Sequence, residues 1–448
     1  MGITVVQKSD LSARRKHAKI ALVLAGGAIT GGAFKAGGLK ALDDFLVNKK
    51  TTEFDSYVGL SAGAILAAPL AAGVSPAEML KSLEGKSSQF DRFGPGDVYM
   101  PNLRDFIACP ARFALDALAF LPGSIAELLT QLPTLAGALQ EPLGVAVRQP
   151  SLNNLERVLA PVGEALAKRR KFPAPLDYLP SGFFDNASIE NYLQRNFLKR
   201  NIPNDFRGLQ RRTGKELYIS AMNLDTAERV VFGYDEDNSV TVSQAVQASS
   251  ALPGFYKPAR INGVDYVDGG VRRTANIDVA IEHGADLVIC YNPFRPFSNR
   301  VRRIPTKDGG FKIEGEMLAE SGILSVVNQV FRTLLHSRLQ YGLRQYQDDP
   351  NFHGDIVVIE PKETDRSFFQ MSAMSYWQRL DAAQHGYISV TESIQQNYDL
   401  IKQLFESYGV TMTRKEVRAG IERLRDDDDD SASDVLLRDV PRRNLSVA

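Results

Sequence analysis

The chain has 448 residues, enough for two or three domains or for one large α/β domain with insertions. Its composition is that of an ordinary globular protein, and 53 basic residues balance 53 acidic ones, so no net charge recruits nucleic acid or anionic lipid. Two cysteines, Cys109 and Cys290, are too few for a disulfide scaffold or a Cys-rich zinc site, which favours a reducing compartment.

The N-terminal segment has some features of an export signal. Basic residues between 14 and 19 precede an apolar run over 20–25, but the run is too short and stops at Gly26, so we interpret it as a buried strand. A myristoylation signal would need Ser or Thr where Val6 stands. No uncharged apolar stretch reaches the roughly 18 residues that span a bilayer. We therefore expect a cytoplasmic protein without a signal peptide or transmembrane helix.

Strands and helices alternate after an N-terminal extension over 1–18. The pattern predicts a strand, a glycine-rich turn, a helix, a second strand and a small-residue helix kinked at Pro69. This order is typical of a parallel sheet covered by helices, so we expect a three-layer α/β/α sandwich with a mostly parallel sheet. The strands lie at 20–25 and 54–60, the turn at 26–32 and the second helix at 62–72.

An apolar stretch over 98–150 is interrupted by prolines. Because proline ends or kinks a helix, we expect short apolar helices and turns, within an insertion at about 90–180. These pieces either pack as a small core or form a mobile lid that docks on a bilayer. The prolines are Pro101, Pro110, Pro122, Pro133 and Pro142, and the lid candidates are Phe106, Ile107, Phe113, Phe120 and Leu121.

Ordinary core patterns return in the second half of the chain. The last two helices are expected to form a C-terminal helical layer over 291–418, and residues 419–448 an acidic disordered tail. A calcium loop in that tail would need spaced ligands and a glycine, which the acidic run lacks. The expected strands lie at 216–223, 229–232, 286–291 and 355–360, and the helices at 243–250, near 316–345 and near 376–407.

Gly59-Leu60-Ser61-Ala62-Gly63 is a G-x-S-x-G motif. By itself such a motif arises by chance in about one chain of this size in ten. Its context is more specific, because an apolar strand enters Ser61 and an Ala-rich helix leaves it, as a nucleophilic serine on an elbow requires. Gly59 and Gly63 fit a strained turn at which neighbouring backbones come close. The sequence predicts a nucleophile at Ser61, with a serine at an ordinary tight turn as the alternative.

A histidine is the usual base for an elbow serine. None of the histidines here lies in a recognisable signature. His283 and His385 each precede a glycine, which is typical of a helix C-terminus, while His336 falls within an expected helix and His353 in a loop.

Asp268 is the better candidate for the base. It follows a strand-like run and precedes Gly269 and Gly270, which let another backbone come close. A partly desolvated aspartate has the proton affinity needed to take the proton of Ser61. Asp-Gly-Gly is also a common turn, so the assignment depends on the other motifs.

The glycine-rich segment 26–32 offers backbone N–H groups for an anion. A phosphate loop would need Lys and then Ser or Thr after Gly31, and the segment has no G-x-G-x-x-G register. The remaining interpretation is an oxyanion hole for a tetrahedral intermediate.

These motifs together resemble the patatin-like phospholipase family. The glycine-rich turn, Gly59–Gly63, the stretch 247–255 and Asp268–Gly270 follow the order and approximate spacing of that family over residues 20–290. The resemblance implies a catalytic domain over 19–290 that hydrolyses fatty-acyl esters of phospholipids or other lipids at a peripheral membrane surface. It implies no metal, organic cofactor or nucleic-acid partner. The C-terminal helices resemble extensions of some bacterial members.

The resemblance also implies residue roles. Ser61 would be the nucleophile and Asp268 the base of a dyad without a catalytic histidine. The backbone around Gly26, Gly27 and Ala28 would form the oxyanion hole. Ala28 replaces the third glycine of the family, and its N–H remains usable if its φ is negative.

Thr30 replaces the basic residue that is often present in this turn of the family. A non-catalytic membrane or interaction protein that retains the fold is therefore the first alternative. The second is an α/β nucleotide binder.

Overall fold

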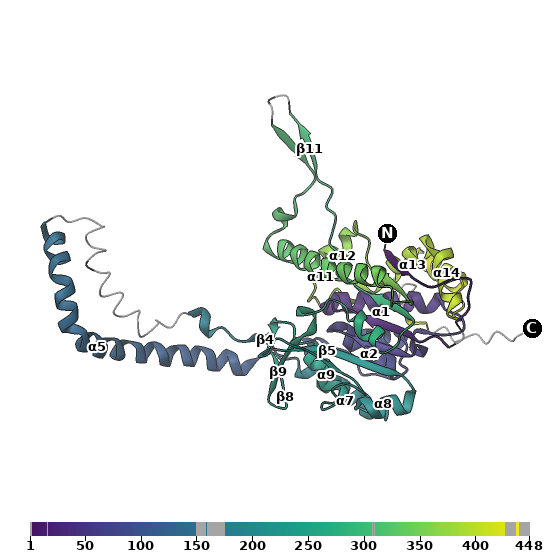
Figure 1. Ribbon diagram of the computed structural model, residues 1–448, viewed down its shortest axis with the longest axis horizontal. Helices are drawn as coiled ribbons and strands as arrows, with labels where there is room; N and C mark the ends of the chain where they lie inside the picture. Colours follow the sequence, from purple (N-terminus) through teal and green to yellow (C-terminus); the bar gives the residue numbers. More distant parts are fainter. Residues whose placement is uncertain are drawn as a thin grey trace, which may run out of the picture. The chain divides into compact units, whose positions relative to one another are not determined.

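The structure is a computed structural model that describes residues 2–15, 17–148, 158, 175–306, 308, 310–425 and 436–438, apart from the side chains at 117–136, 146, 175–176 and 421–425. The chain divides into two units (Figure 1). Met1–Met100 and Phe184–Ala448 form the first, and Pro101–Phe183 form the second.

A mixed sheet forms the centre of the first unit. Among the described residues it has nine strands, in the order β1-β13-β10-β2-β3-β5-β9-β8, with β6 added beside β5. The five strands from β13 to β5 are parallel, and the strands at either edge are antiparallel. The strands are β1 (Ile3–Gln7), β2 (Ile20–Leu24), β3 (Ser56–Gly59), β5 (Glu216–Asn223), β6 (Arg229–Phe232), β8 (Ala259–Ile261), β9 (Val264–Asp268), β10 (Leu287–Tyr291) and β13 (Asp355–Ile359).

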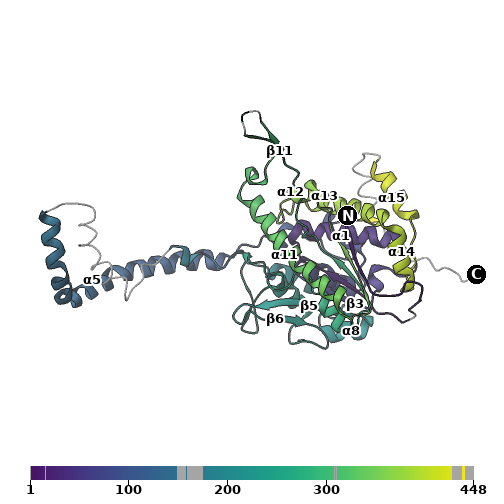
Figure 2. The ribbon, with the colours of Figure 1, turned by 45° about the horizontal axis from the view of Figure 1, so that its top comes forward.

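Helices cover both faces of this sheet (Figure 2). Along β2, Leu22 and Leu24 belong to one hydrophobic cluster and Ala21 and Val23 to the other, because alternate residues of a strand point to opposite faces. The predicted three-layer α/β/α sandwich is therefore confirmed. The helices of the first unit are α1 (Ala28–Phe45), α2 (Ala62–Ala71), α3 (Pro76–Glu84), α4 (Pro95–Val98), α7 (Ala187–Lys199), α8 (Phe206–Thr213), α9 (Val242–Ser249), α10 (Ile277–Glu282), α11 (Ile323–Asp348), α12 (Arg366–Gln370), α13 (Arg379–Gln396), α14 (Tyr398–Ser407) and α15 (Lys415–Arg425).

The C-terminal part of the chain packs into the same core as the N-terminal part. Helices α1 and α13 touch backbone to backbone, since a Cβ on Gly37 would overlap the Ala383 carbonyl and a Cβ on Gly386 would overlap the Phe34 carbonyl. Strand β13 lies in the central sheet, between β1 and β10. The C-terminal residues therefore share one core with the N-terminal part of the chain.

Some local features differ from the expectations. Helix α1 begins at Ala28, so the glycine-rich turn predicted over 26–32 is confined to Gly26 and Gly27. Residues 3–7 form an edge strand, and β11 (Arg302–Pro305) and β12 (Phe311–Glu314) form a hairpin that was not foreseen. Short edge strands and hairpins bury little, so they leave a weak apolar pattern in the sequence.

In the second unit, α5 (Leu103–Arg148) is one helix. The expectation of short helices and turns was wrong, because a helix rich in Ala and Leu continues through a proline when only one backbone hydrogen bond is lost there. Within this unit the Phe113 ring lies 5.3 Å from the Tyr178 ring. Phe106 and Ile107 are exposed and do not form a packed core, so the lid stays a prediction; the side chains of Phe120 and Leu121 lie outside the described residues.

Two further expectations concern membrane-spanning helices and the C-terminal acidic tail. Among the described residues, no helix has both the length and the apolar character needed to cross a membrane. Residues 419–425 of the expected acidic tail belong to α15, and 426–435 and 439–448 lie outside the described residues.

Candidate active site

Ser61 occupies a sharp elbow between β3 and α2. Its φ of 55° and ψ of −128° fall in a region that residues with a side chain rarely adopt. In this conformation the chain passes directly from the carboxyl end of the buried strand β3 into helix α2. The N–H groups at the N-terminus of α2 then lie behind the serine.

Two glycines permit this elbow. A Cβ on Gly63 would overlap the carbonyl oxygens of Leu24 and Ala25 at the end of β2, and a Cβ on Gly59 would lie 2.6 Å from the Ala64 Cα. Both positions therefore exclude any side chain. The close approach fixes the first turn of α2 against the end of the neighbouring strand.

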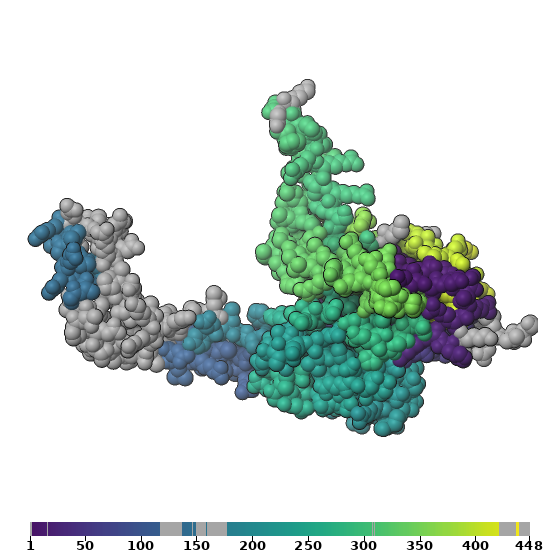
Figure 3. Space-filling model, in the orientation of Figure 1, coloured from purple at the N-terminus to yellow at the C-terminus, as the bar shows by residue number. Residues whose placement is uncertain are grey.

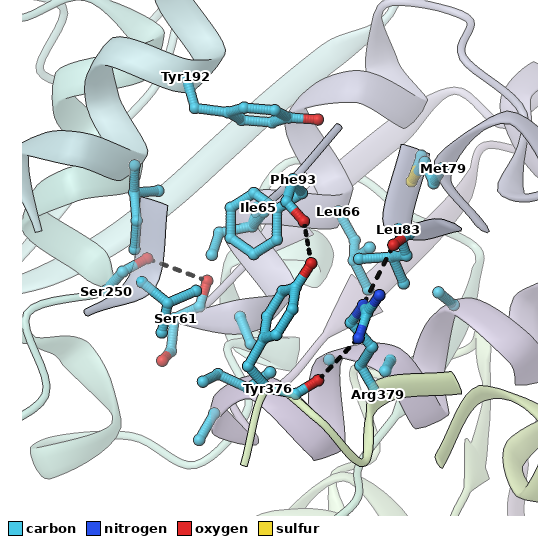
Figure 4. Close-up of a pocket in the computed structure, with 18 of the residues that line it drawn as sticks. Ser61, Ile65, Leu66, Met79, Leu83, Phe93, Tyr192, Ser250, Tyr376 and Arg379 are labelled. Carbon is cyan, nitrogen blue, oxygen red and sulfur yellow. Dashed lines mark hydrogen bonds between the residues drawn. The ribbon is translucent and has the colours of Figure 1, made fainter. Parts of the chain in front are cut away.

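The stretch 247–255 holds the elbow from the other side. The Ser249 hydroxyl accepts the Ser61 N–H at 2.8 Å and donates to the Ser220 carbonyl at 2.7 Å. The neighbouring Ser250 hydroxyl donates to the Ser61 carbonyl at 3.5 Å (Figure 4). All these groups are buried, so the strained serine is locked by a polar network that reaches strand β5.

Asp268 is the last residue of β9 and is almost completely buried beside Ser61. Its Oδ1 accepts the Gly270 N–H at 2.8 Å. Burial raises the pKa of Asp268 to about 6, against the opposing effects of hydrogen bonding to Ser61, the Gly270 N–H and the charge of Lys35. The carboxylate is therefore a stronger base than an exposed aspartate, yet is still ionised at neutral pH.

The turn before α1 lies next to Ser61. A Cβ on Gly26 would lie 3.4 Å from the Ser61 Cβ. Gly27 has a φ of 147° and Ala28 a φ of 53°, so the negative φ that was set as the condition for using the Ala28 N–H is not found. Alanine tolerates the left-handed conformation at a cost of about 1 kcal/mol because its side chain is small.

The backbone N–H groups at the N-terminus of α1 differ in their hydrogen bonding. The Ala373 carbonyl, on the loop between α12 and α13, accepts the N–H groups of Ile29 and Thr30 at 3.0 and 3.1 Å. Within the described residues, the N–H groups of Gly27 and Ala28 donate to no partner. Two adjacent backbone donors next to the elbow are thus left without an acceptor in the part of the chain that the structure describes.

Lys35 is a buried residue next to the site that the sequence reasoning missed. It is fully buried one helical turn after Gly31, and its Nζ donates to the carbonyls of Ala25 and Gly26, the latter at 2.6 Å. Burial lowers the pKa of Lys35 to about 7, against the opposing charge of Asp268. A lone lysine among small apolar residues at 33–39 was the available signal.

An apolar pocket opens from Ser61. Its empty space, including the open mouth and the solvent there, is about 1010 Å³, and almost all of its lining is apolar. Figure 4 shows Ser61 on one side of the pocket and Met79 and Leu83 on the other. Arg379 fixes part of the wall, because its Nε donates to the Leu83 carbonyl at 3.1 Å and its Nη1 to the Tyr376 carbonyl at 3.3 Å.

The described histidines lie away from this pocket's lining. His336 contacts Glu360, and His283 ends α10 as predicted. His385 lies inside α13 and contacts Asp365, so its expected place at a helix end was wrong. The following glycine is there for close packing against α1, not to end the helix.

Comparison with models of known families agrees with the motifs found in the sequence. The family model described as patatin-like phospholipase matches residues 22–281, more than half of the chain. The chain belongs to the patatin-like phospholipase family. The match includes Ser61, Asp268 and the turn before α1, which confirms the resemblance seen in the sequence.

Individual relatives of this patatin-like chain are distant. A probable lipid hydrolase, 463L of Invertebrate iridescent virus 6, is 26% identical over 104 residues, which cover 23% of this chain and 36% of the relative. The chain thus matches only about a third of that relative's length. Among solved structures, VipD from Legionella pneumophila is 14% identical with a TM-score of 0.35, covering 97% of this chain and 82% of VipD.

A second solved structure contains full-length ExoU from Pseudomonas aeruginosa in complex with SpcU. That chain is 18% identical to this one, with a TM-score of 0.26, and the alignment covers 94% of this chain and 64% of the other.

The hydrogen bond to Ser249 gives a direct test of how the elbow is held. Ser249→Ala leaves the buried Ser61 N–H without an acceptor, so we expect a loss of about 1–3 kcal/mol in the free energy of unfolding, measured by denaturant titration. Ser250→Ala is the matched control, because its bond to the Ser61 carbonyl is long, and we expect about 0.5 kcal/mol. Equal losses in the two variants would contradict this account.

Proposed function

We propose that the protein is a serine-dependent lipid acyl hydrolase. The observation that carries the proposal is the position of Ser61: a strained elbow, beside a buried carboxylate, at the wall of a large apolar pocket. Family membership and the lipid-hydrolase relative support the same chemistry.

The proposed reaction uses Ser61 and Asp268 in two steps. Ser61 Oγ attacks the acyl carbonyl carbon while Asp268 takes its proton, and the ester C–O bond breaks as that proton passes to the leaving alcohol. Water then attacks the carbonyl carbon of the acyl-enzyme while Asp268 accepts a proton from it, the bond from the acyl group to Ser61 Oγ breaks, and that proton passes to Ser61 Oγ as the fatty acid leaves. The N–H groups of the segment Gly26–Ala28 would hold the oxyanion in both steps.

The pocket supports a fatty-acyl substrate rather than a small polar ester. It continues from Ser61 along α2, past Ile65 and Leu66, to Met79 of α3 and Tyr192 of α7. Almost all of this surface is apolar, so it favours a hydrocarbon chain over water. A nucleotide would find few polar partners here, which weakens the nucleotide-binding alternative.

Lys35 weakens the alternative that the protein is not catalytic. That alternative arose because Thr30 stands where the family often has a basic residue. Lys35 places a buried amine next to the turn before α1, held by the carbonyls of Ala25 and Gly26, and this amine is a cation below its pKa of about 7. In our proposal this cation holds the turn in position and supplies positive charge near the reaction.

The dyad is tested by single and double substitutions. We expect Ser61→Ala and Asp268→Asn each to lower kcat/KM for a fatty-acyl ester by at least ~10³-fold, and the double variant to be little worse, because groups that act as one unit are not additive. Steady-state assays on folded variants measure this.

Histidine variants provide the control for the dyad. His336→Ala and His385→Ala should retain most of the activity, since both side chains contact carboxylates outside the pocket lining. A folded histidine variant as inactive as Ser61→Ala would replace the dyad by a triad.

The role of Lys35 is tested by the pH profile. Asp268 must be ionised to accept a proton, so kcat/KM should fall as the pH drops through about 6. The charge of Lys35 lowers the pKa of Asp268, so Lys35→Met should raise that pKa and move the acidic limb to higher pH.

Lys40→Met is the matched control, since Lys40 is a buried lysine of the same helix whose partner is Asp44, at 2.6 Å. Its acidic limb should stay near that of the unmodified protein. An unmoved limb in folded Lys35→Met would mean that Lys35 is structural only.

A further inference from the structure

Helix α11 exposes an apolar stripe along its N-terminal half. The stripe residues recur every three or four positions, so they share one face of the helix. Between 323 and 334 the helix has no acidic residue, and Arg332 is buried. The stripe consists of Ile323, Leu324, Val327, Val330, Phe331 and Leu334, with exposed fractions from 40% to 82%.

The opposite face of α11 fixes the helix in this orientation. Arg332 Nη1 donates to the Pro293 carbonyl at 2.9 Å, and the Thr274 hydroxyl donates to the Leu335 carbonyl at 2.8 Å. Leu339 and Leu343 are buried against the sheet. Rotating the stripe inward would break these contacts, so its exposure is a fixed property of the fold.

The β11–β12 hairpin adds positive charge beside this stripe. Arg303 pairs with Ile313 and Pro305 with Phe311, so one face of the hairpin combines a cation with apolar side chains. The sequence over 300–314 has five basic and two acidic residues, although the whole chain is neutral. Ile313 and Phe311 are exposed.

The stem of the hairpin is attached to α11. Gln329 donates to the Phe297 carbonyl at 2.7 Å and accepts the Phe297 N–H at 3.1 Å, and Asn299 closes the stem through the Glu316 carbonyl at 2.8 Å. Figures 1 and 2 show the hairpin projecting from the side of the first unit on which α11 lies, and Figure 3 shows it standing clear of the body. The stripe and the hairpin thus belong to one surface.

We propose that the α11 stripe and the β11–β12 hairpin form a docking surface for an anionic lipid bilayer. An apolar helix face beside a basic, apolar hairpin matches the boundary between acyl chains and negative headgroups. A water-soluble protein partner would not require both features, and a patch of this kind is unusual on a surface that stays in water.

The surface is also connected to the site. Arg338, farther along α11, donates to the Val271 carbonyl at 2.9 Å, three residues after Asp268. A bilayer on this surface would therefore lie beside the segment that carries the base. Lipid delivery to Ser61 rests on the proposed function, whereas docking itself does not.

Vesicle co-sedimentation of the full chain tests the docking. Ser61→Ala serves as the background so that no vesicle lipid is consumed, and binding is compared between phosphatidylcholine vesicles and equal mixtures with phosphatidylserine. We expect tighter binding to the mixed vesicles, weakened by salt. Leu324→Asp should weaken binding to both at least tenfold, and Arg303→Glu to the mixed vesicles alone.

Leu198→Asp is the matched control, because Leu198 of α7 is as exposed as Leu324 but lies outside this surface. It should bind like the background protein. Placed in the active chain, Leu324→Asp should still hydrolyse a short soluble ester, which separates lost docking from lost catalysis. Unchanged vesicle binding by Leu324→Asp, or dimerisation through the stripe without any vesicle binding, would overturn the proposal.

Discussion

The close passage of Gly63 beside the carbonyls of Leu24 and Ala25 is the constraint on which the rest of the site depends. It fixes the start of α2 against the end of β2 and forces Ser61 into a backbone conformation that costs of the order of 1–3 kcal/mol. The parallel sheet, the Ser249 network and the packing of α13 on α1 hold the elements that meet there. The strain is sustained because so many surrounding contacts would be lost if it relaxed.

Burial sets the electrostatics of the site. Removed from water, Asp268 gains proton affinity, while hydrogen bonding to Ser61 and the Gly270 N–H, and to a lesser extent the charge of Lys35, opposes this rise and leaves its pKa at about 6. The lysine is held by the backbone carbonyls of Ala25 and Gly26, in the turn that passes next to Ser61. One side chain thus contacts the turn before α1 and also acts on the pKa of Asp268.

The central strands of the sheet were predicted well from the sequence. A buried lysine, an exposed hairpin, an exposed helix face and a proline-containing helix were not. Strands 216–223 and 229–232 match to the residue. The first is buried over six of its eight residues and so has a nearly continuous apolar pattern, whereas the second is only partly buried and was marked by its β-branched residues. Lys35 was missed since its partners are carbonyls, which leave no trace in side-chain identity. The net charge of zero gave no sign of the basic β11–β12 hairpin. The α11 stripe has the apolar sequence pattern of a core-facing helix, and only the fold shows that its side chains are exposed among the described residues. Helix α5 was misjudged because proline was treated as a necessary helix end.

Peptide mass spectrometry after reaction with a fluorophosphonate tests the central claim most directly, since the reagent bonds covalently to a serine that a nearby base activates. The account predicts one adduct, on the peptide that contains Ser61, formed far more slowly in Asp268→Asn. An adduct on a different serine, or equal labelling rates with and without the Asp268 carboxylate, would contradict it.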